Sequence, residues 1–131
     1  MLNIVEIRSD SDIVTARQQG RMLAVELGLA GTDAALVATA ISELARNIVM
    51  YAGRGQILLR PAENGGRPGV NVVASDDGPG IVDIEQAMQL GYSTSGSLGL
   101  GLPGVRRLMD EFEVISEVGK GTRITVTKWK T

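Results

Sequence analysis

The stretch Ser42-Glu43-Leu44-Ala45-Arg46-Asn47 lies inside a longer run, residues 32–51, whose pattern predicts a helix. Apolar side chains recur along this run at steps of three and four residues and form one stripe: Val37, Ile41, Leu44 and Ile48. Glu43 and Asn47 are four residues apart, so they share one edge of that stripe. A carboxylate or an amide beside a core needs a partner, because burying it alone is costly. The partner is either structural, such as a cap or a neighbouring Arg, or a ligand.

The length and composition restrict the class of protein. The chain has 131 residues, which predicts one domain over residues 1–131. It contains no Cys and no His, which excludes disulfides, thiolate nucleophiles, His-based zinc sites and Ser-His-Asp catalysis. The net charge is -2 and the basic residues are scattered, so nucleic-acid binding is not indicated. No signal peptide is visible and no apolar run approaches the roughly 20 residues that span a membrane, so we expect a cytoplasmic protein.

The rest of the chain reads as further helices and strands around the central helix. The elements expected up to the end of that helix are a strand over residues 2–8, a helix from about residue 9 to Gly28, an N-cap at Thr32 and a stop at Gly53. The later ones are an antiparallel hairpin of strands 56–60 and 70–74, a short helix within 81–89, a helix from Pro103 to about Glu111, and strands 112–118 and 122–128. Helices grouped between antiparallel hairpins predict a two-layer α+β sandwich, and short hairpin loops disfavour a doubly wound parallel sheet.

The first segment that invites a ligand is Asp76-Asp77-Gly78-Pro79-Gly80, which directly follows a predicted strand. Asp, Gly and Pro are all turn formers, so an ordinary turn is one interpretation. The other is a nucleotide site. A carboxylate at a strand end can accept a hydrogen bond from the exocyclic amine of adenine, and the glycines let a base approach the backbone closely.

The second segment is rich in glycine and runs from Ser95 to Gly104, just before the predicted helix at Pro103. It contains neither the phosphate-loop motif nor a dinucleotide fingerprint. Its backbone N–H groups, together with the positive end of the helix, would suit a polyphosphate. The alternation of Gly with Leu is too apolar to favour a disordered loop, so phosphate binding is the preferred interpretation.

Four strings occur in order along the chain: Glu43-x-x-x-Asn47, Asp76-x-Gly78-x-Gly80-Ile81, Gly99-Leu100-Gly101-Leu102 and Gly121-Thr122. Each is weak alone, but together they resemble the Bergerat-fold ATPases of the GHKL superfamily, which includes gyrase, Hsp90, histidine kinases and MutL. The resemblance covers nearly the whole chain. It implies a two-layer α/β sandwich with a mixed, mainly antiparallel sheet covered by helices on one face.

Within that superfamily the chain resembles the small protein serine/threonine kinases of bacterial sigma-factor partner switching, because it offers no phospho-acceptor His. It is most similar to the stressosome switch kinases of the RsbT type, which are related to the anti-sigma factor kinases of the RsbW type. Besides the helix that carries Glu43, the strings that support this are Tyr51-Ala52-Gly53-Arg54-Gly55-Gln56-Ile57, Thr94-Ser95-Gly96 and the run from Gly101 to Phe112.

The resemblance implies a role for individual residues. Asn47 would bind a Mg²⁺ ion that bridges the ATP phosphates, and Glu43 would be the general base that takes the proton from the substrate hydroxyl. Asp76 would bind adenine N6, and Thr122 would support Asp76 through a hydrogen bond or water. The remaining contacts to the nucleotide are expected from Gly78, Gly80, Ile81, Gly96, Gly99, Leu100, Gly101 and Leu102.

One departure from the family pattern concerns the cation that faces the γ-phosphate. The related anti-sigma kinases carry an Arg a few residues before the GxG of the glycine loop, where this chain has Gly96, Ser97 and Leu98. Arg46, Arg106 and Arg107 are candidates for this role, and none is assigned.

By resemblance, the expected function is ATP- and Mg²⁺-dependent phosphorylation of a Ser or Thr on a STAS-domain protein of the stressosome. The released kinase would then bind and activate a PP2C-type phosphatase. The alternative is an anti-sigma factor or scaffold-docked binding module whose nucleotide site controls partner choice. A fragment of an ATPase motor or chaperone is disfavoured by the small size of the chain. If Glu43 and Asn47 bind ligands rather than other groups of the protein, these two side chains should border a wet cleft.

Overall fold

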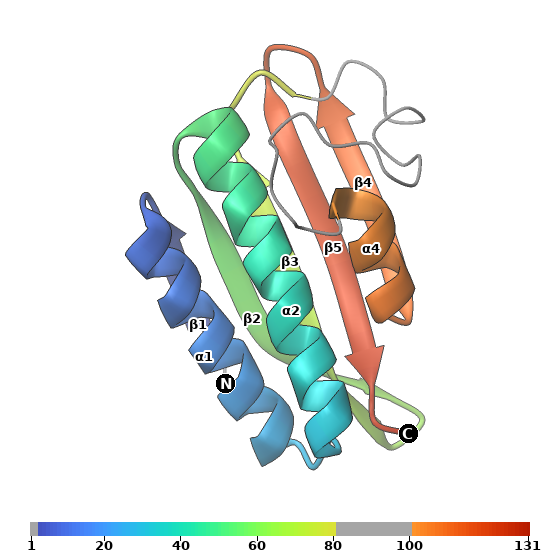
Figure 1. The fold of residues 1–131 in the computed structure, drawn as a ribbon. Helices are drawn as coiled ribbons and strands as arrows, with labels where there is room; N and C mark the ends of the chain where they lie inside the picture. Colours follow the sequence, from blue (N-terminus) through green and yellow to red (C-terminus); the bar gives the residue numbers. More distant parts are fainter. Residues whose placement is uncertain (1–2, 81–100) are drawn as a thin grey trace.

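The computed structural model describes residues 3–80 and 101–131, which form a layer of helices on one face of a five-stranded sheet (Figure 1). The helices are α1 (Asp10–Glu26), α2 (Gly31–Asn47), the π-helix η1 (Ile48–Ala52) and α4 (Gly101–Leu108). The strands are β1 (Asn3–Ile7), β2 (Gly55–Asn64), β3 (Arg67–Asp76), β4 (Glu111–Glu117) and β5 (Gly121–Trp129). The predicted two-layer α+β sandwich is therefore confirmed.

The sheet has the order β1-β2-β3-β5-β4, and each pair of neighbouring strands is antiparallel. The expectation of a mixed sheet was wrong for the described residues. The reason is that β1, although two helices separate it from β2 along the chain, enters the sheet in the opposite direction to β2. One row of paired residues crosses the whole sheet near the end that carries Asp76 and consists of Ile7, Gly55, Asp76, Thr122 and Ser116.

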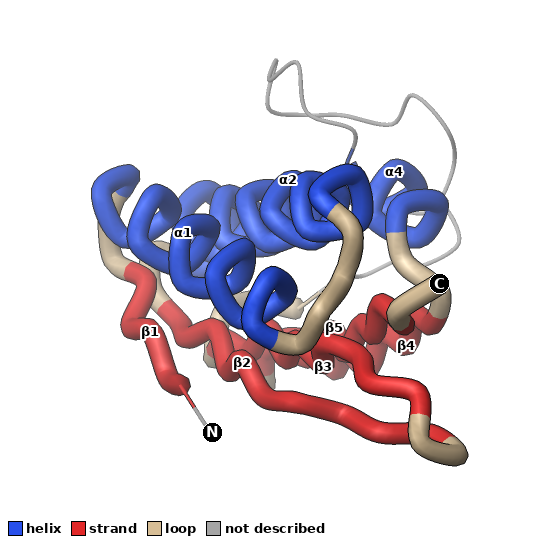
Figure 2. The backbone as a smooth tube through the Cα atoms, turned by 90° about the horizontal axis from the view of Figure 1, so that it is seen from below, coloured by secondary structure: helices blue, strands red, loops and turns tan. Residues whose placement is uncertain are grey.

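The core lies between the two layers, which Figure 2 shows edge-on. From the helices it receives aliphatic side chains such as Ile13, Leu23, Val37, Ile41 and Leu44. The strands contribute alternate residues on their helix-facing side, among them Ile57, Leu59, Val70, Val72, Ile124 and Val126. This is the aliphatic core that a chain with four aromatic residues requires.

The central helix has the predicted extent but a different start. It begins at Gly31 after an N-cap at Ala30, so the expected N-cap at Thr32 was wrong by two positions. At its other end the helix continues as η1, and Gly53 stops it with a φ of 83°, as predicted. The segment Gly31–Ala52 has 22 residues and the apolar composition of a membrane-spanning helix. The expectation that no run would approach the length and composition of such a helix was therefore wrong. Half of its apolar window is buried in the protein, as in the core helix of a sandwich.

Contact between α1 and α2 depends on one glycine. A Cβ atom at Gly20 of α1 would overlap the terminal methyl group of Ile41, which is fully buried. The missing side chain therefore lets the two helix axes approach closely. The two helices lie side by side over the sheet, and α4 lies on the other side of α2 (Figures 1 and 2).

The remaining predicted elements match with small shifts at their ends. Ser9 caps α1, and the backbone N–H of Ser9 donates a hydrogen bond to the Asp12 carboxylate at 3.1 Å. The strands of the first hairpin extend further than predicted, to a two-residue turn at Gly65 and Gly66. The short helix predicted within 81–89 lies outside the described residues.

Candidate functional site

Glu43 lies on α2 and is almost buried, with 9% of its surface exposed. Within residues 3–80 and 101–131 its carboxylate accepts no hydrogen bond and forms no ion pair. No fully buried polar side-chain atom in that part of the chain lacks a partner, so the carboxylate oxygens keep access to solvent. The cap or neighbouring Arg that would give Glu43 a purely structural role is therefore missing from the described residues.

Asn47 is the last residue of α2, one turn beyond Glu43, and is half-buried. Its side chain also has no hydrogen-bond partner among the described residues. The π-helix η1 begins directly after it, and π-helical turns are frequent at functional sites. This wider turn leads to Ala52, which packs on Gly78 of the loop after β3. The helix end that carries Asn47 is thus tied to the loop that follows Asp76.

Asp76 is the final residue of β3 and is half-buried on the helix-facing side of the sheet. The backbone N–H of Gly78 donates a hydrogen bond to its Oδ1 atom at 2.9 Å. That bond fixes the carboxylate and leaves Oδ2 with no partner among the described residues. A fixed acceptor at a strand end is what the predicted contact to an exocyclic amine requires.

Packing leaves no room for a side chain at Gly78 and Gly80, the two glycines that follow Asp76. A Cβ atom at Gly78 would lie 2.6 Å from Cβ of Ala52, and one at Gly80 would lie 2.5 Å from the carbonyl oxygen of Glu117. The N–H of Gly119 also donates to the carbonyl of Pro79 at 2.9 Å. The loop 77–80 is therefore clamped between the end of η1 and the β4–β5 turn. Whether Gly78 and Gly80 also contact a base stays a prediction.

Thr122 lies beside Asp76, since the two residues are paired between β5 and β3. The structure gives its hydroxyl a partner that the sequence did not indicate: Oγ of Ser116, at 3.0 Å. No hydrogen bond joins Thr122 to Asp76 among the described residues, so direct support of the carboxylate by Thr122 is not observed. Ser116 was missed because its position depends on the register of β4 with β5, which no local pattern reveals.

Of the residues predicted to bind phosphate, Gly101 and Leu102 form the first turn of α4, and Leu102 is buried where α4 packs on α2. Ile81, Gly96, Gly99 and Leu100 lie outside the described residues. Among the candidate cations, Arg46 is half-buried on α2, while Arg106 and Arg107 are exposed in the last turn of α4. None of these three arginines forms an ion pair within the described part of the chain.

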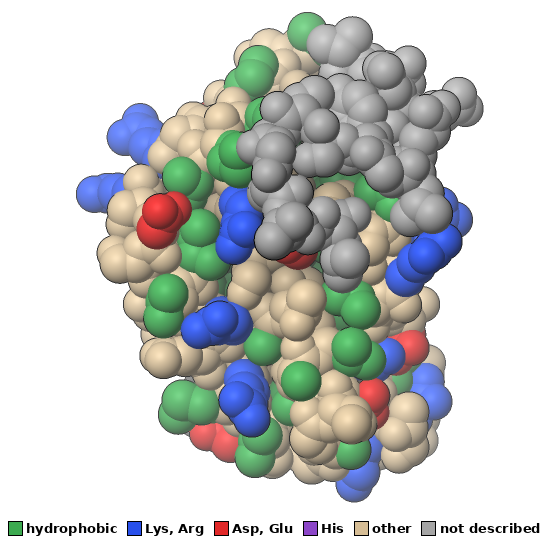
Figure 3. All heavy atoms as spheres, in the orientation of Figure 1, with side chains coloured by type: hydrophobic (Ala, Val, Ile, Leu, Met, Phe, Trp, Pro, Cys, Tyr) green, Lys and Arg blue, Asp and Glu red, His purple; other side chains and the backbone are tan. Residues whose placement is uncertain are grey.

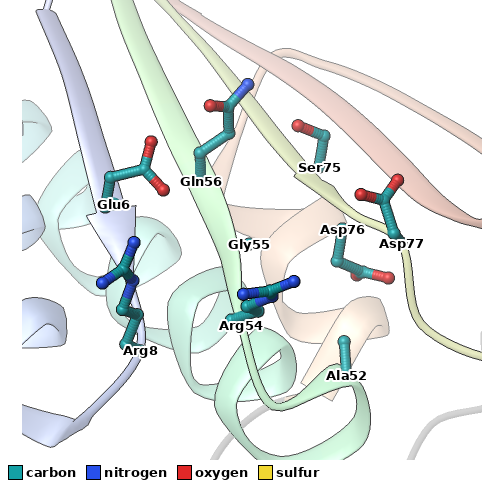
Figure 4. A pocket seen from close by; sticks show the side chains of 9 residues that line it. All are labelled: Glu6, Arg8, Ala52, Arg54, Gly55, Gln56, Ser75, Asp76 and Asp77. Atoms are coloured by element: carbon teal, nitrogen blue, oxygen red, sulfur yellow. The ribbon is translucent and has the colours of Figure 1, made fainter.

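A polar pocket of about 450 Å³ lies at the ends of β1, β2 and β3 (Figure 4). It is lined by Glu6, Arg8, Ala52, Arg54, Gly55, Gln56, Ser75, Asp76 and Asp77. It shares Asp76 with the candidate nucleotide site but contains neither Glu43 nor Asn47. Figure 3 shows basic and hydrophobic side chains scattered over the helix face, with a few acidic side chains among them.

Comparison with known proteins finds a family of ATPases and two groups of related regulatory proteins. A family model described as histidine kinase-, DNA gyrase B-, and HSP90-like ATPase matches residues 32–131. A serine/threonine-protein kinase, RsbT of Bacillus subtilis (strain 168), is 54% identical over 125 residues, which cover 95% of this chain and 94% of that protein. An anti-sigma F factor of Thermoanaerobacter sp. (strain X514) is 34% identical over 99 residues, which cover 71% of this chain and 68% of that protein.

Solved structures show the same fold. The crystal structure of the RsbU and RsbW domains of a Mycobacterium tuberculosis protein matches 96% of this chain with a TM-score of 0.65 and 21% identity. This chain spans about a third of that one, 32% of its length. The mycobacterial sensor histidine kinase MprB matches 98% of this chain and 97% of its own, with a TM-score of 0.56 and 14% identity. At these identities the likeness concerns the fold alone.

Proposed function

The chain belongs to the family of histidine kinase-, DNA gyrase B- and HSP90-like ATPases and is a protein serine/threonine kinase, and from this premise we propose that Glu43 is its general base. The observation that carries the proposal is the Glu43 carboxylate, almost buried and without a partner among the described residues. A protein that only bound nucleotide would need the loops and Asn47 but no base. A carboxylate that is held almost buried, without a partner but with its oxygens open to solvent, is therefore best explained by catalysis.

The residues of the site fit a nucleotide with one bound divalent ion. The family implies ATP binding, and Asp76 offers a fixed acceptor for the base of that nucleotide. No group of three or more acidic residues that could hold a metal exists within residues 3–80 and 101–131. One amide oxygen, from Asn47, suits Mg²⁺, which keeps several waters and takes its other ligands from phosphates. The ion would neutralise phosphate charge when bound.

The chemistry assigned to this site is transfer of the γ-phosphoryl group to a hydroxyl. Glu43 accepts the proton of the substrate Ser or Thr hydroxyl while the oxygen of that hydroxyl bonds to the γ-phosphorus. The bond from the γ-phosphorus to the β–γ bridging oxygen breaks. ADP is the leaving group. Asn47, one helical turn further on, would hold the divalent ion, which would neutralise the charge of the phosphates. The glycine-rich residues 96–102 would bind the phosphates through their backbone N–H groups.

The similarity to RsbT and to anti-sigma factors supports a proposal for the substrate and partners. We infer that the substrate is a Ser or Thr on a STAS-domain protein of a stressosome, and that the released kinase binds and activates a PP2C-type phosphatase. We propose that residues 1–131 form one domain and that the kinase acts in the cytoplasm. The alternative is an anti-sigma factor or scaffold-docked module whose nucleotide site controls partner choice, which the 34% identity to anti-sigma F factors favours.

The test is to mix the purified chain with γ-labelled ATP, Mg²⁺ and a STAS-domain protein of a stressosome. The label should appear on a Ser or Thr of the STAS protein, and omission of Mg²⁺ should prevent this. If the chain binds Mg-ATP but transfers no label, while nucleotide changes its binding to a sigma factor or STAS protein, the alternative function is correct.

A further inference from the structure

A row of three polar side chains crosses the sheet at the candidate nucleotide site. Asp76 on β3 is paired with Thr122 on β5, and Thr122 is paired in turn with Ser116 on β4. Paired residues of neighbouring strands point to the same face of a sheet, and here that face is the one the helices cover. Asp76, Thr122 and Ser116 therefore lie side by side, with Ser116 farthest from the carboxylate.

The hydrogen bonds within this row favour one direction of the Thr122 hydroxyl. Ser116 Oγ donates to the carbonyl oxygen of Gly121 at 3.2 Å and lies 3.0 Å from Oγ1 of Thr122. A hydroxyl has one proton, so a Ser116 hydroxyl that donates to Gly121 can only accept from Thr122. The proton of Thr122 then points toward Ser116, and its lone pairs are left for the side of Asp76.

Two acceptors consequently face the place where a base would bind. One is Oδ2 of Asp76, since Oδ1 already accepts the N–H of Gly78. The other is Oγ1 of Thr122. A pair of acceptors suits the exocyclic amino group of adenine, directly or through a water, because that group carries two N–H donors. Guanine would place its O6 acceptor there and leave these half-buried acceptors unpaired, which is costly.

We propose that Ser116 is a positioning residue for nucleotide specificity: it orients the Thr122 hydroxyl as an acceptor and so makes the Asp76 site select adenine over guanine. This rests on the proposed function, in which Asp76 binds the base. Without Ser116, the Thr122 hydroxyl can rotate and donate its proton, either to Asp76 or to O6 of guanine. The preference for adenine should then weaken even though Asp76 and Thr122 are both intact.

The test measures the affinities of ATP and GTP for the wild type and for Ser116→Ala, by calorimetry in the presence of Mg²⁺. We expect the ratio of the two affinities to fall by about tenfold in Ser116→Ala, the size expected for about one hydrogen bond. Ser116→Thr, which keeps the hydroxyl, should retain the ratio. Thr125→Val is the matched control, because it removes a hydroxyl from β5 three residues away, on the opposite face of the sheet, and should leave the ratio unchanged.

A double variant separates positioning from general damage. If Ser116 acts through Thr122, then Ser116→Ala should have no further effect on the ratio in a Thr122→Val background. An unchanged ratio in Ser116→Ala, or equal effects of Ser116→Ala with and without Thr122, would overturn the proposal. Failure of the wild type to bind ATP at all would instead refute the proposed nucleotide site, so the two failures are distinguishable.

Discussion

The backbone of Gly121 lies directly against the carbonyl group of Asp76, so closely that a Cβ atom at Gly121 would overlap the carbonyl oxygen. Gly121 also has a φ of 108°, which residues with side chains rarely adopt. The first residue of β5 thus holds the last residue of β3 in place. The position of the Asp76 carboxylate depends on this contact as much as on its own hydrogen bond to Gly78.

Substitution Gly121→Ala should therefore lower both stability and nucleotide affinity. We expect a loss of about 3 kcal/mol in the free energy of unfolding, from backbone strain and overlap together. Urea unfolding followed by the fluorescence of Trp129, the single Trp of the chain, measures it. Gly119→Ala is the matched control, since its φ is 82° but a Cβ atom there meets nothing within 4 Å. Its cost should be about 1 kcal/mol. Equal costs would refute the contact between Gly121 and Asp76.

The contact between α1 and α2 predicts a coupled pair of substitutions. Gly20→Ala should destabilise the fold by about 1 kcal/mol, because overpacking against Ile41 outweighs the gain in helix propensity. Ile41→Val removes the methyl group that the new side chain would overlap. The double variant should be more stable than the sum of the single effects, by about 1 kcal/mol in urea unfolding. Additive effects would show that the helices do not meet at these two residues.

Asn47 should matter for binding of the metal–nucleotide complex. Asn47→Ala should lower the affinity for Mg-ATP by about tenfold or more, because an oxygen ligand of the ion is lost. Calorimetric titration with and without Mg²⁺ measures this, and the variant should show little dependence on the ion. Asn3→Ala, at a half-buried amide of β1, is the control. If Asn47→Ala binds Mg-ATP as the wild type does, its role as a metal ligand is wrong.

Most of the fold was predictable because its signals are local. The stripe of Val37, Ile41 and Leu44 indicates a core helix, and alternation and turn residues indicate the hairpins. The start of α2 was missed because Thr32 is a better N-cap by residue type than Ala30, the residue that precedes the helix in the structure. The antiparallel placement of β1 was missed because direction in a sheet depends on contacts distant in the sequence.

The candidate site was predictable only in part. The residues of its motifs, such as Glu43 and Asp76, stand out because a buried or fixed carboxylate needs an explanation. Ser116 carries no such signal, since a lone Ser in a strand is ordinary until the register places it beside Thr122. The tight packing of Gly78 on Ala52 likewise depends on a contact between segments far apart in the chain. The close packing at Gly78 shows that a glycine of a sequence motif can be required by packing.

The most direct test of Glu43 as the general base is the rate of phosphoryl transfer from Mg-ATP to a STAS-domain protein, measured for the wild type and for Glu43→Gln. The substitution keeps the size of the side chain and removes its basicity. Because general-base catalysis contributes about 100-fold or more, transfer should fall by at least that factor, while the affinity for Mg-ATP changes by no more than about threefold. Transfer by Glu43→Gln at the rate of the wild type would contradict the assignment.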